Sequence, residues 1–187
     1  MRKRQKSSIL RENLNVFKNV RPITKRPKVV DKKIRLGDLE RDLICGTQTG
    51  AVILSVNDRV SRKVKIGWTP GKASKLIHKK TIALLKNHPG VRSLTNDHGC
   101  EFAQYKRTEK ILRTKIYFST KGCAWERGAN ENTNGLLRQY FPRRMDFNRI
   151  TQKQIRAAEN RLNNRPRKCL AFQTPNEVEE RMGQVLR

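Results

Sequence analysis

Three carboxylates lie at or near the ends of predicted strands and helices, where a fold can bring side chains together to form a catalytic site. Asp42 opens the first predicted strand, Asp97 closes the fourth, and Glu131 lies at or near the start of a helix after the fifth. Mg²⁺ prefers such oxygen ligands, and two ions about 3.5 to 4 Å apart can activate an attacking oxygen and stabilise a leaving one at a phosphodiester. Spacing alone does not establish this site, because any three carboxylates can be drawn as a triangle.

Each of these acids also has a structural interpretation. Asp38 could exchange roles with Asp42, because both stand in the same short segment, and Glu126 competes with Glu131. Asp97 fits a turn, which is a common use of aspartate. Glu131 in a first helical turn would be stabilised by the helix dipole. The residues by themselves leave these alternatives open.

The charge of the chain indicates its partner. Among 187 residues there are 43 Lys and Arg but 16 Asp and Glu, which gives a formal net charge of +27. Such an excess destabilises a compact protein unless a polyanion neutralises it, so we expect a nucleic acid as the partner. No apolar run approaches the roughly 18 residues that span a bilayer, so we expect no membrane partner.

The elements that must position the acids follow from hydrophobic periodicity. Residues 1–36 are rich in Lys and Arg without a sustained period, which indicates a basic arm or linker. From residue 37, the runs 42–48, 50–58 and 60–68 predict three neighbouring antiparallel strands, and 72–90 predicts an amphipathic helix.

The second half of the chain alternates further strands and helices. A short strand ends near residues 96–97, a helix is predicted over 100–112, a strand over 115–120 and a helix over 131–141. Thr151 and Thr174 open two more helices, because each precedes Gln or Glu by three positions as in a capping box. This order predicts an α/β fold with a mixed five-stranded sheet flanked by helices.

Five segments resemble, in order, the signature blocks of bacterial transposases of the insertion-sequence-thirty family. They cover about residues 35 to 180 and read GDLERDLICG, NDRVSRKVKIG, TNDHGCEFA, WERGANENTNGLLRQYFP and RLNNRPRKCLAFQTPNEV. The resemblance implies an integrase-type catalytic core with a ribonuclease-H-like fold, over residues 37–187 and including the C-terminal helices. It also implies that Asp42, Asp97 and Glu131 are the catalytic acids and bind Mg²⁺ or Mn²⁺, as two ions.

The resemblance implies a DNA transposase. Such an enzyme cuts one strand at an insertion-sequence end and joins the freed 3′-hydroxyl to target DNA without a covalent protein intermediate, generally as a homo-oligomer. The residues expected to contact DNA are Arg127, Asn132, Asn134 and Arg138. A bacterial enzyme of this kind is expected in the cytoplasm, associated with the nucleoid.

The chain also departs from the family pattern. Leu39 and Arg41 replace a tryptophan and a small residue, and only a basic segment of about forty residues precedes the core, where the family carries helix-turn-helix segments. These departures keep a second hypothesis open, namely a catalytically inactive, truncated transposase remnant that only binds DNA. We expect Trp68 and Trp125 to pack in the protein interior rather than stack on bases.

Overall fold

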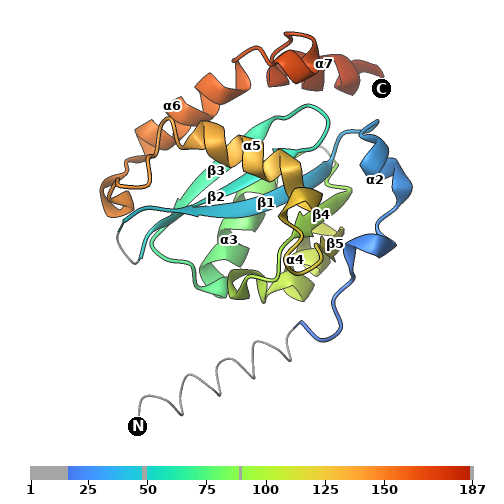
Figure 1. Ribbon diagram of the computed structural model, residues 1–187, viewed down its shortest axis with the longest axis horizontal. Helices are drawn as coiled ribbons and strands as arrows, with labels where there is room; N and C mark the ends of the chain where they lie inside the picture. The colour runs from blue at the N-terminus through green and yellow to red at the C-terminus, as the bar shows by residue number, and fades with distance from the viewer. Residues whose placement is uncertain (1–16, 48–49, 89, 186–187) are drawn as a thin grey trace.

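A five-stranded mixed sheet forms the centre of the computed structural model, which describes residues 17–47, 50–88 and 90–185 (Figure 1). The strands lie in the order β3-β2-β1-β4-β5. They are β1 (Asp38–Cys45), β2 (Val52–Asp58), β3 (Val64–Thr69), β4 (Ser93–Asn96) and β5 (Lys115–Phe118). The first three pair antiparallel, whereas β4 pairs parallel with both β1 and β5. The predicted mixed five-stranded sheet is confirmed.

Helices cover both faces of this sheet (Figure 1). One face carries α3 (Ser74–Leu85) and α4 (Tyr105–Leu112), and the other carries α5 (Gly128–Leu137) and α6 (Gln152–Asn163). The last helix, α7 (Pro175–Val185), packs against α6. The short helices are η1 (Ile23–Lys25), α2 (Lys28–Lys32), η2 (Cys100–Phe102), η3 (Ala124–Arg127), η4 (Phe147–Arg149) and η5 (Lys168–Leu170).

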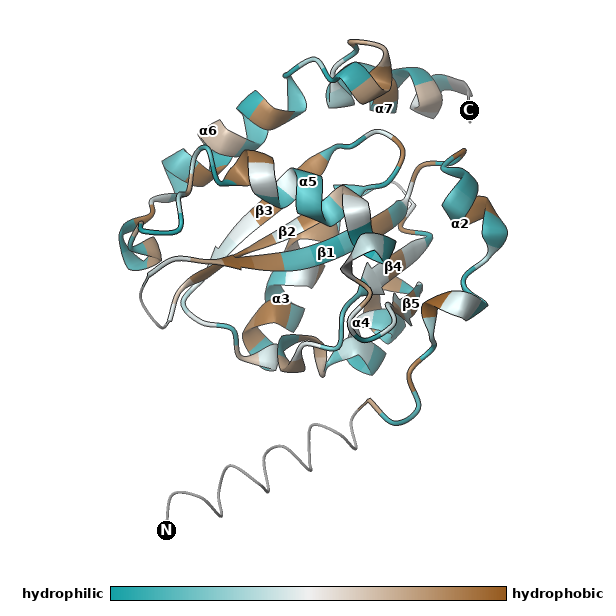
Figure 2. Ribbon diagram, viewed as in Figure 1, coloured by the Kyte–Doolittle hydropathy of each residue, from teal (hydrophilic) through white to brown (hydrophobic). Residues whose placement is uncertain are grey.

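Two buried apolar clusters hold the layers together. Beneath α5 and α6, the core is built around residues such as Ile44, Ile53 and Leu137, and beneath α3 and α4 around residues such as Leu54 and Leu94. Burial of this apolar surface is the main force that fixes the helices on the sheet. Figure 2 shows the exception, a hydrophilic stretch within β1 where α5 crosses it.

The sequence signals for helix ends hold in the structure. Thr151 and Gln154 form both hydrogen bonds of a capping box at the start of α6. The Thr174 N–H donates to Glu177 Oε2 at 2.7 Å, and the Glu177 N–H donates to Thr174 Oγ1 at 3.2 Å, which caps α7 in the same way. Both predicted capping boxes are therefore present, and α6 and α7 begin where the sequence indicated.

The described part of the basic N-terminal segment lies on the core rather than extending from it. Residues 1–16 are outside the described part, but Val30 is buried, and Pro22 bridges to Phe118 at the end of β5. Arg26 is buried as well, and its Nη1 donates to Thr95 Oγ1 at 2.9 Å. Apolar residues placed among the cations therefore anchor the stretch from residue 17 to 36.

None of the helices in the described part of the chain combines the length and the apolar character needed to cross a membrane.

Candidate active site

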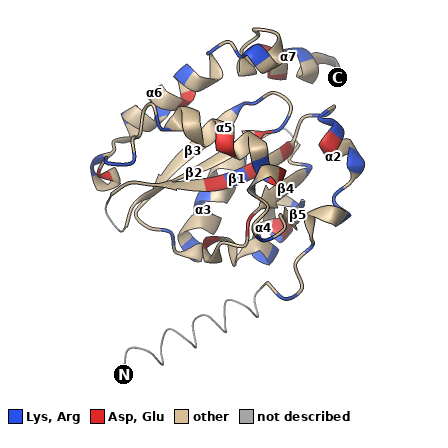
Figure 3. Cartoon of the chain, viewed as in Figure 1, with Lys and Arg blue, Asp and Glu red and all other residues tan. Residues whose placement is uncertain are grey.

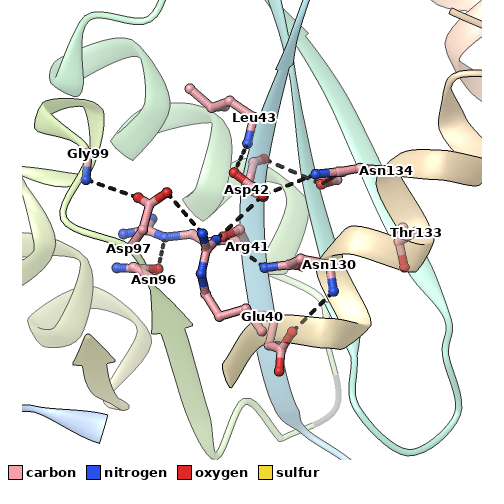
Figure 4. A network of polar contacts seen from close by, with 12 residues as sticks. Glu40, Arg41, Asp42, Leu43, Asn96, Asp97, Gly99, Asn130, Thr133 and Asn134 are labelled. Atoms are coloured by element: carbon pink, nitrogen blue, oxygen red, sulfur yellow. Dashed lines mark hydrogen bonds and ion pairs between the residues drawn. The ribbon is translucent and has the colours of Figure 1, made fainter. Parts of the chain in front are cut away.

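Asp42 and Asp97 come from neighbouring parallel strands. The register pairs Asp38 with Ser93 and Glu40 with Thr95, and its continuation sets Asp42 level with Asp97, directly after β4. Parallel strands lie about 4.8 Å apart, so the two carboxylates face each other across one strand spacing (Figure 4). The sequence placed Asp42 at the start of its strand, but β1 begins four residues earlier and holds Asp42 in its second half.

Arg127 lies between the two aspartates. Its Nη1 is 3.4 Å from Asp42 Oδ2, and its Nη2 donates to Asp97 Oδ2 at 3.2 Å. The guanidinium therefore supplies a cation at the point where the two carboxylates approach. Arg127 was expected to contact DNA phosphates; in this arrangement its charge is directed at the aspartates, and the phosphate contact stays a prediction.

The Asp42 carboxylate is held from three directions. Asn134 Nδ2 donates to its Oδ2 at 3.0 Å, and the Leu43 N–H donates to its Oδ1 at 2.8 Å. Burial raises the pKa of Asp42 above its ordinary value, and Asp97 acts in the same direction, whereas Arg127 and these two donors lower it. A cation close by therefore favours the ionised form of this carboxylate.

The asparagines of α5 fasten this helix to the sheet. Asn130 is buried; its Nδ2 donates to the Arg41 carbonyl at 3.3 Å, and its Oδ1 accepts from Asn57 Nδ2 at 2.5 Å. The Asn130 N–H donates to Glu40 Oε2 at 3.2 Å. Because a buried polar group needs a partner, these bonds explain the hydrophilic stretch of β1 beneath α5.

Glu131 lies in the first turn of α5, as expected, but its side chain is exposed. The structure brings Asp42 and Asp97 together and leaves Glu131 outside their hydrogen-bonded network. Across residues 17–47, 50–88 and 90–185, no three His, Cys, Asp or Glu side chains are grouped closely enough to hold a metal ion. The three-carboxylate metal site thus stays a prediction for which two members are adjacent.

Two of the competing acids have structural partners instead. Asp38 is buried, accepts from Ser93 Oγ at 2.6 Å and pairs with Arg35 at 2.7 Å. Glu126 accepts from the Thr120 N–H at 2.7 Å and from Thr120 Oγ1 at 3.1 Å. Both carboxylates are therefore engaged in local structural contacts. This favours Asp42 and Glu131 as the functional acids.

The other residues expected at the DNA lie around the same helix. Asn132 is exposed, and Arg138 Nη1 donates to the Cys45 carbonyl at 2.8 Å, just beyond the end of α5. Beside Asp97, a cavity of about 360 Å³ opens between the loop after β4 and the turn after β5, lined among others by Ser119, Lys121 and Arg127. A basic, polar cavity next to the aspartates suits a phosphate-bearing ligand.

Arg41 and Asn96, the residues directly before the two aspartates, join the two strands that carry the site. Sequence reasoning missed this role. On the opposite face of the sheet, Arg41 is buried and its Nε donates to Asn96 Oδ1 at 2.6 Å. The signal available in the sequence was a charged residue where the family has a small one. The contact partner could not be found from the sequence, because 55 positions separate the two residues.

The sequence of this chain is similar to those of known transposases. The chain is 46% identical over 156 residues to the transposase for insertion sequence element IS4351 of Bacteroides fragilis, and 38% identical over 173 residues to transposase InsI for insertion sequence element IS30A of Escherichia coli. These alignments cover 83% and 91% of this chain. Over most of its length the chain is therefore homologous to transposases of the insertion-sequence-thirty family. It spans about half the length of these relatives, 48% and 45%.

Structural comparison identifies the fold of this chain. The catalytic core domain of BIV integrase superimposes with a TM-score of 0.61 at 16% sequence identity. The match covers 81% of this chain and 99% of that domain. At this identity the likeness concerns the fold, which is the integrase-core, ribonuclease-H-like fold that the resemblance implied. No protein-family model matches the chain.

Proposed function

We propose that this chain is the catalytic core of a transposase that cuts and joins phosphodiester bonds of DNA at insertion-sequence ends. The observation that carries the proposal is the position of Asp42 and Asp97, level with each other on the parallel strands β1 and β4 of an integrase-core fold. Homology to transposases supports the reaction class.

The residues present fit a divalent cation. A buried carboxylate with a raised pKa and a second carboxylate facing it already hold a positive group, the Arg127 guanidinium, between them. Mg²⁺ or Mn²⁺ bound by these oxygens would supply the activation of the attacking oxygen and the stabilisation of the leaving oxygen. Asp42, Asp97 and Glu131 are the residues that would hold the ions.

The surrounding side chains hold the acids and α5 in position. Asn134 fixes one oxygen of Asp42, so that the carboxylate keeps one orientation, and Asn130 fixes α5, which carries Glu131, on β1 and β2. Lys and Arg are spread over the helices and loops around the acids (Figure 3). This basic frame would bind the DNA backbone, with Arg127, Arg138, Asn132 and Asn134 as the nearest polar contacts.

A second candidate function has an observation in its favour. Arg127 lies between the two aspartates and Glu131 is exposed on α5, an arrangement that also suits a transposase remnant that binds DNA without cutting it. The two candidates predict the same steep loss of DNA affinity with salt, because both depend on the +27 charge. DNA binding alone therefore does not separate them.

The test is a cleavage assay with labelled duplex DNA carrying the terminal repeats of the element. The protein is incubated with Mg²⁺ or Mn²⁺, and Asp42→Asn and Glu131→Gln are compared with Glu126→Gln, the matched control for a glutamate in the same region. We expect metal-dependent nicking and joining in wild type and the control, and a loss of at least about a hundredfold in the other two. Equal products in wild type and Glu131→Gln would refute the catalytic role.

A further inference from the structure

A second cavity, of about 380 Å³, lies at the start of α5. Its wall is formed by the residue after α2, by β1, by the hairpin between β2 and β3, by η3 and the beginning of α5, and by Cys169 of η5; Figure 1 shows how α2, β1 to β3 and α5 are arranged. Glu40 and Arg59 line it, on the same face of the sheet as Asp42, and so do Lys33, Arg62, Trp125 and Asn132. Glu40 precedes Asp42 by two residue steps of β1, about 7 Å between their Cα atoms, so this cavity adjoins the candidate active site.

Trp125 is the first unusual feature of this cavity. Its side chain is 73% exposed, whereas Trp68 is half-buried and donates from Nε1 to the Phe147 carbonyl at 2.7 Å. The prediction that both tryptophans pack inside is therefore wrong for Trp125, which lies in η3 and belongs to neither apolar cluster of the described residues. An indole face open to solvent beside a basic cavity is a platform on which a nucleobase can stack.

Arg59 is the second feature. It is 7% exposed, its Nη1 donates to Glu40 Oε1 at 2.5 Å, and its buried Nε has no hydrogen-bond partner among the described residues. A buried N–H without a partner costs free energy, which a turn of the Arg59 side chain towards an acceptor in the cavity would recover. A phosphate or base oxygen in the cavity is such an acceptor.

The charged side chains around the cavity differ in whether they already have a partner. Both of its carboxylates already have donors: Glu40 binds Arg59, and Glu126 binds Thr120. Within the described ranges, Lys33 and Arg62 make no ion pair. Two cations at the rim therefore remain for an anionic ligand.

We propose that this cavity is a subsite for one unpaired nucleotide of a DNA strand, with its base on Trp125 and its phosphate between Arg62 and Lys33. The inference rests on the proposed function, since it concerns the strand that lies on the active site. A volume of about 380 Å³ suits a single nucleotide rather than a duplex. Glu40, in the wall of the cavity, lies two positions before Asp42 on β1, so a strand bound at the active site could reach the cavity.

The experiment measures binding without cleavage, in EDTA, with the full chain. The probes are a five-residue oligothymidylate and a 15-base-pair duplex, at several salt concentrations. We expect the single strand to quench tryptophan emission in wild type and in Trp68→Phe but not in Trp125→Phe. Trp125→Ala loses about tenfold in single-strand affinity, because stacking on one aromatic ring contributes this much, and less than twofold in duplex affinity.

A charge variant tests the phosphate contact separately. Arg62→Gln lowers single-strand affinity and makes the slope of log affinity against log salt shallower by about 0.7, the value for one phosphate of a single strand. Lys153→Gln, an exposed lysine of α6, is the matched control and leaves both values unchanged. Circular dichroism of each variant checks that the fold is retained.

Three outcomes would overturn the subsite. They are unchanged single-strand affinity in Trp125→Ala, equal quenching by the duplex, and quenching by polyglutamate in place of the oligonucleotide, which would indicate an acidic protein partner. None of these depends on cleavage. If the protein cleaves DNA but shows none of the expected single-strand binding, this inference alone is refuted. If single-strand binding is as expected but wild type and Glu131→Gln give equal cleavage, the proposed catalysis alone is refuted.

Discussion

Arg41 Nε donates a 2.6 Å hydrogen bond to Asn96 Oδ1, and these two residues directly precede the two aspartates of the candidate site. The bond joins β1 to the end of β4 from the face opposite the aspartates. Arg41 Nη1 also donates to Thr81 Oγ1 at 2.9 Å, and its guanidinium lies 4.5 Å from the centre of the Phe102 ring. Burial lowers the pKa of Arg41 to about 9, so it is charged at neutral pH.

Arg41→Met is expected to lower the free energy of unfolding by about 1 to 3 kcal/mol. The substitution leaves the buried Asn96 and Thr81 oxygens without their donor, and an unpaired buried acceptor costs this much. Urea unfolding monitored by circular dichroism measures the change, with Arg107→Met, an exposed arginine of α4, as the control. A double-mutant cycle with Asn96→Ala should give a coupling energy above about 0.5 kcal/mol; additive effects would show that the bond contributes nothing.

Arg127→Gln should change how strongly the protein depends on metal. Without metal, the variant leaves Asp42 and Asp97 facing each other with no cation between them, so its free energy of unfolding falls by about 1 kcal/mol. With Mn²⁺ it gains more stability than wild type, because the ion no longer competes with a guanidinium. Thermal unfolding in EDTA and in Mn²⁺ measures both effects. Lys121→Gln removes an exposed charge beside the same cavity and should behave as wild type in both.

Asn134→Ala should reduce metal-dependent cleavage by about ten- to a hundredfold. The side chain that would be removed holds Asp42 Oδ2 at 3.0 Å, and loss of a residue that orients a metal ligand has effects of this size. Raising the Mn²⁺ concentration should restore part of the activity if the defect is in metal binding. Gln139→Ala, which truncates an exposed polar residue just after α5, is the control. Full activity of Asn134→Ala would remove the positioning role.

The stability of the protein should decrease as the pH falls below about 6.5. Burial lowers the pKa of His78, His88 and His98 below the ordinary value of 6.5, so the unfolded chain binds protons that the folded chain does not. Stability is then complete above the unfolded pKa and is lost as the pH falls from there towards the folded pKa values. Urea unfolding at intervals between about pH 7 and pH 5 measures this loss.

His88→Gln isolates one of these contributions. His88 Nδ1 is buried and has no partner within the described part of the chain, and burial is the largest cause of its lowered pKa, with Lys63 and Lys65 acting in the same direction and Glu179 and Asp58 against it. The variant should lose less stability than wild type over the same pH interval. An identical slope in the two proteins would exclude His88 as a source of the pH dependence.

The sequence alone determined the types of the helices and strands and the order in which they follow one another. Apolar periodicity predicted α3, short apolar runs predicted β1 and β2, an alternating run predicted β3, and Thr151 and Thr174 marked the starts of α6 and α7. These features depend on neighbours within a few residues, which is why a linear pattern reveals them. The ordered motif blocks likewise predicted the transposase family and the integrase-core fold, both of which the comparisons support.

Only the tertiary structure decided which side chains meet. The strand order brings β1 beside β4 and sets Asp42 level with Asp97, while η3 and the following α5 bring Arg127 and Asn134 to the same carboxylate. Asn130 and Asn134 are close to Glu131 in the sequence, yet they bind groups of the sheet. Such contacts join residues up to 92 positions apart. They arise from packing and from the need of buried polar groups for partners, which no local pattern in the sequence encodes.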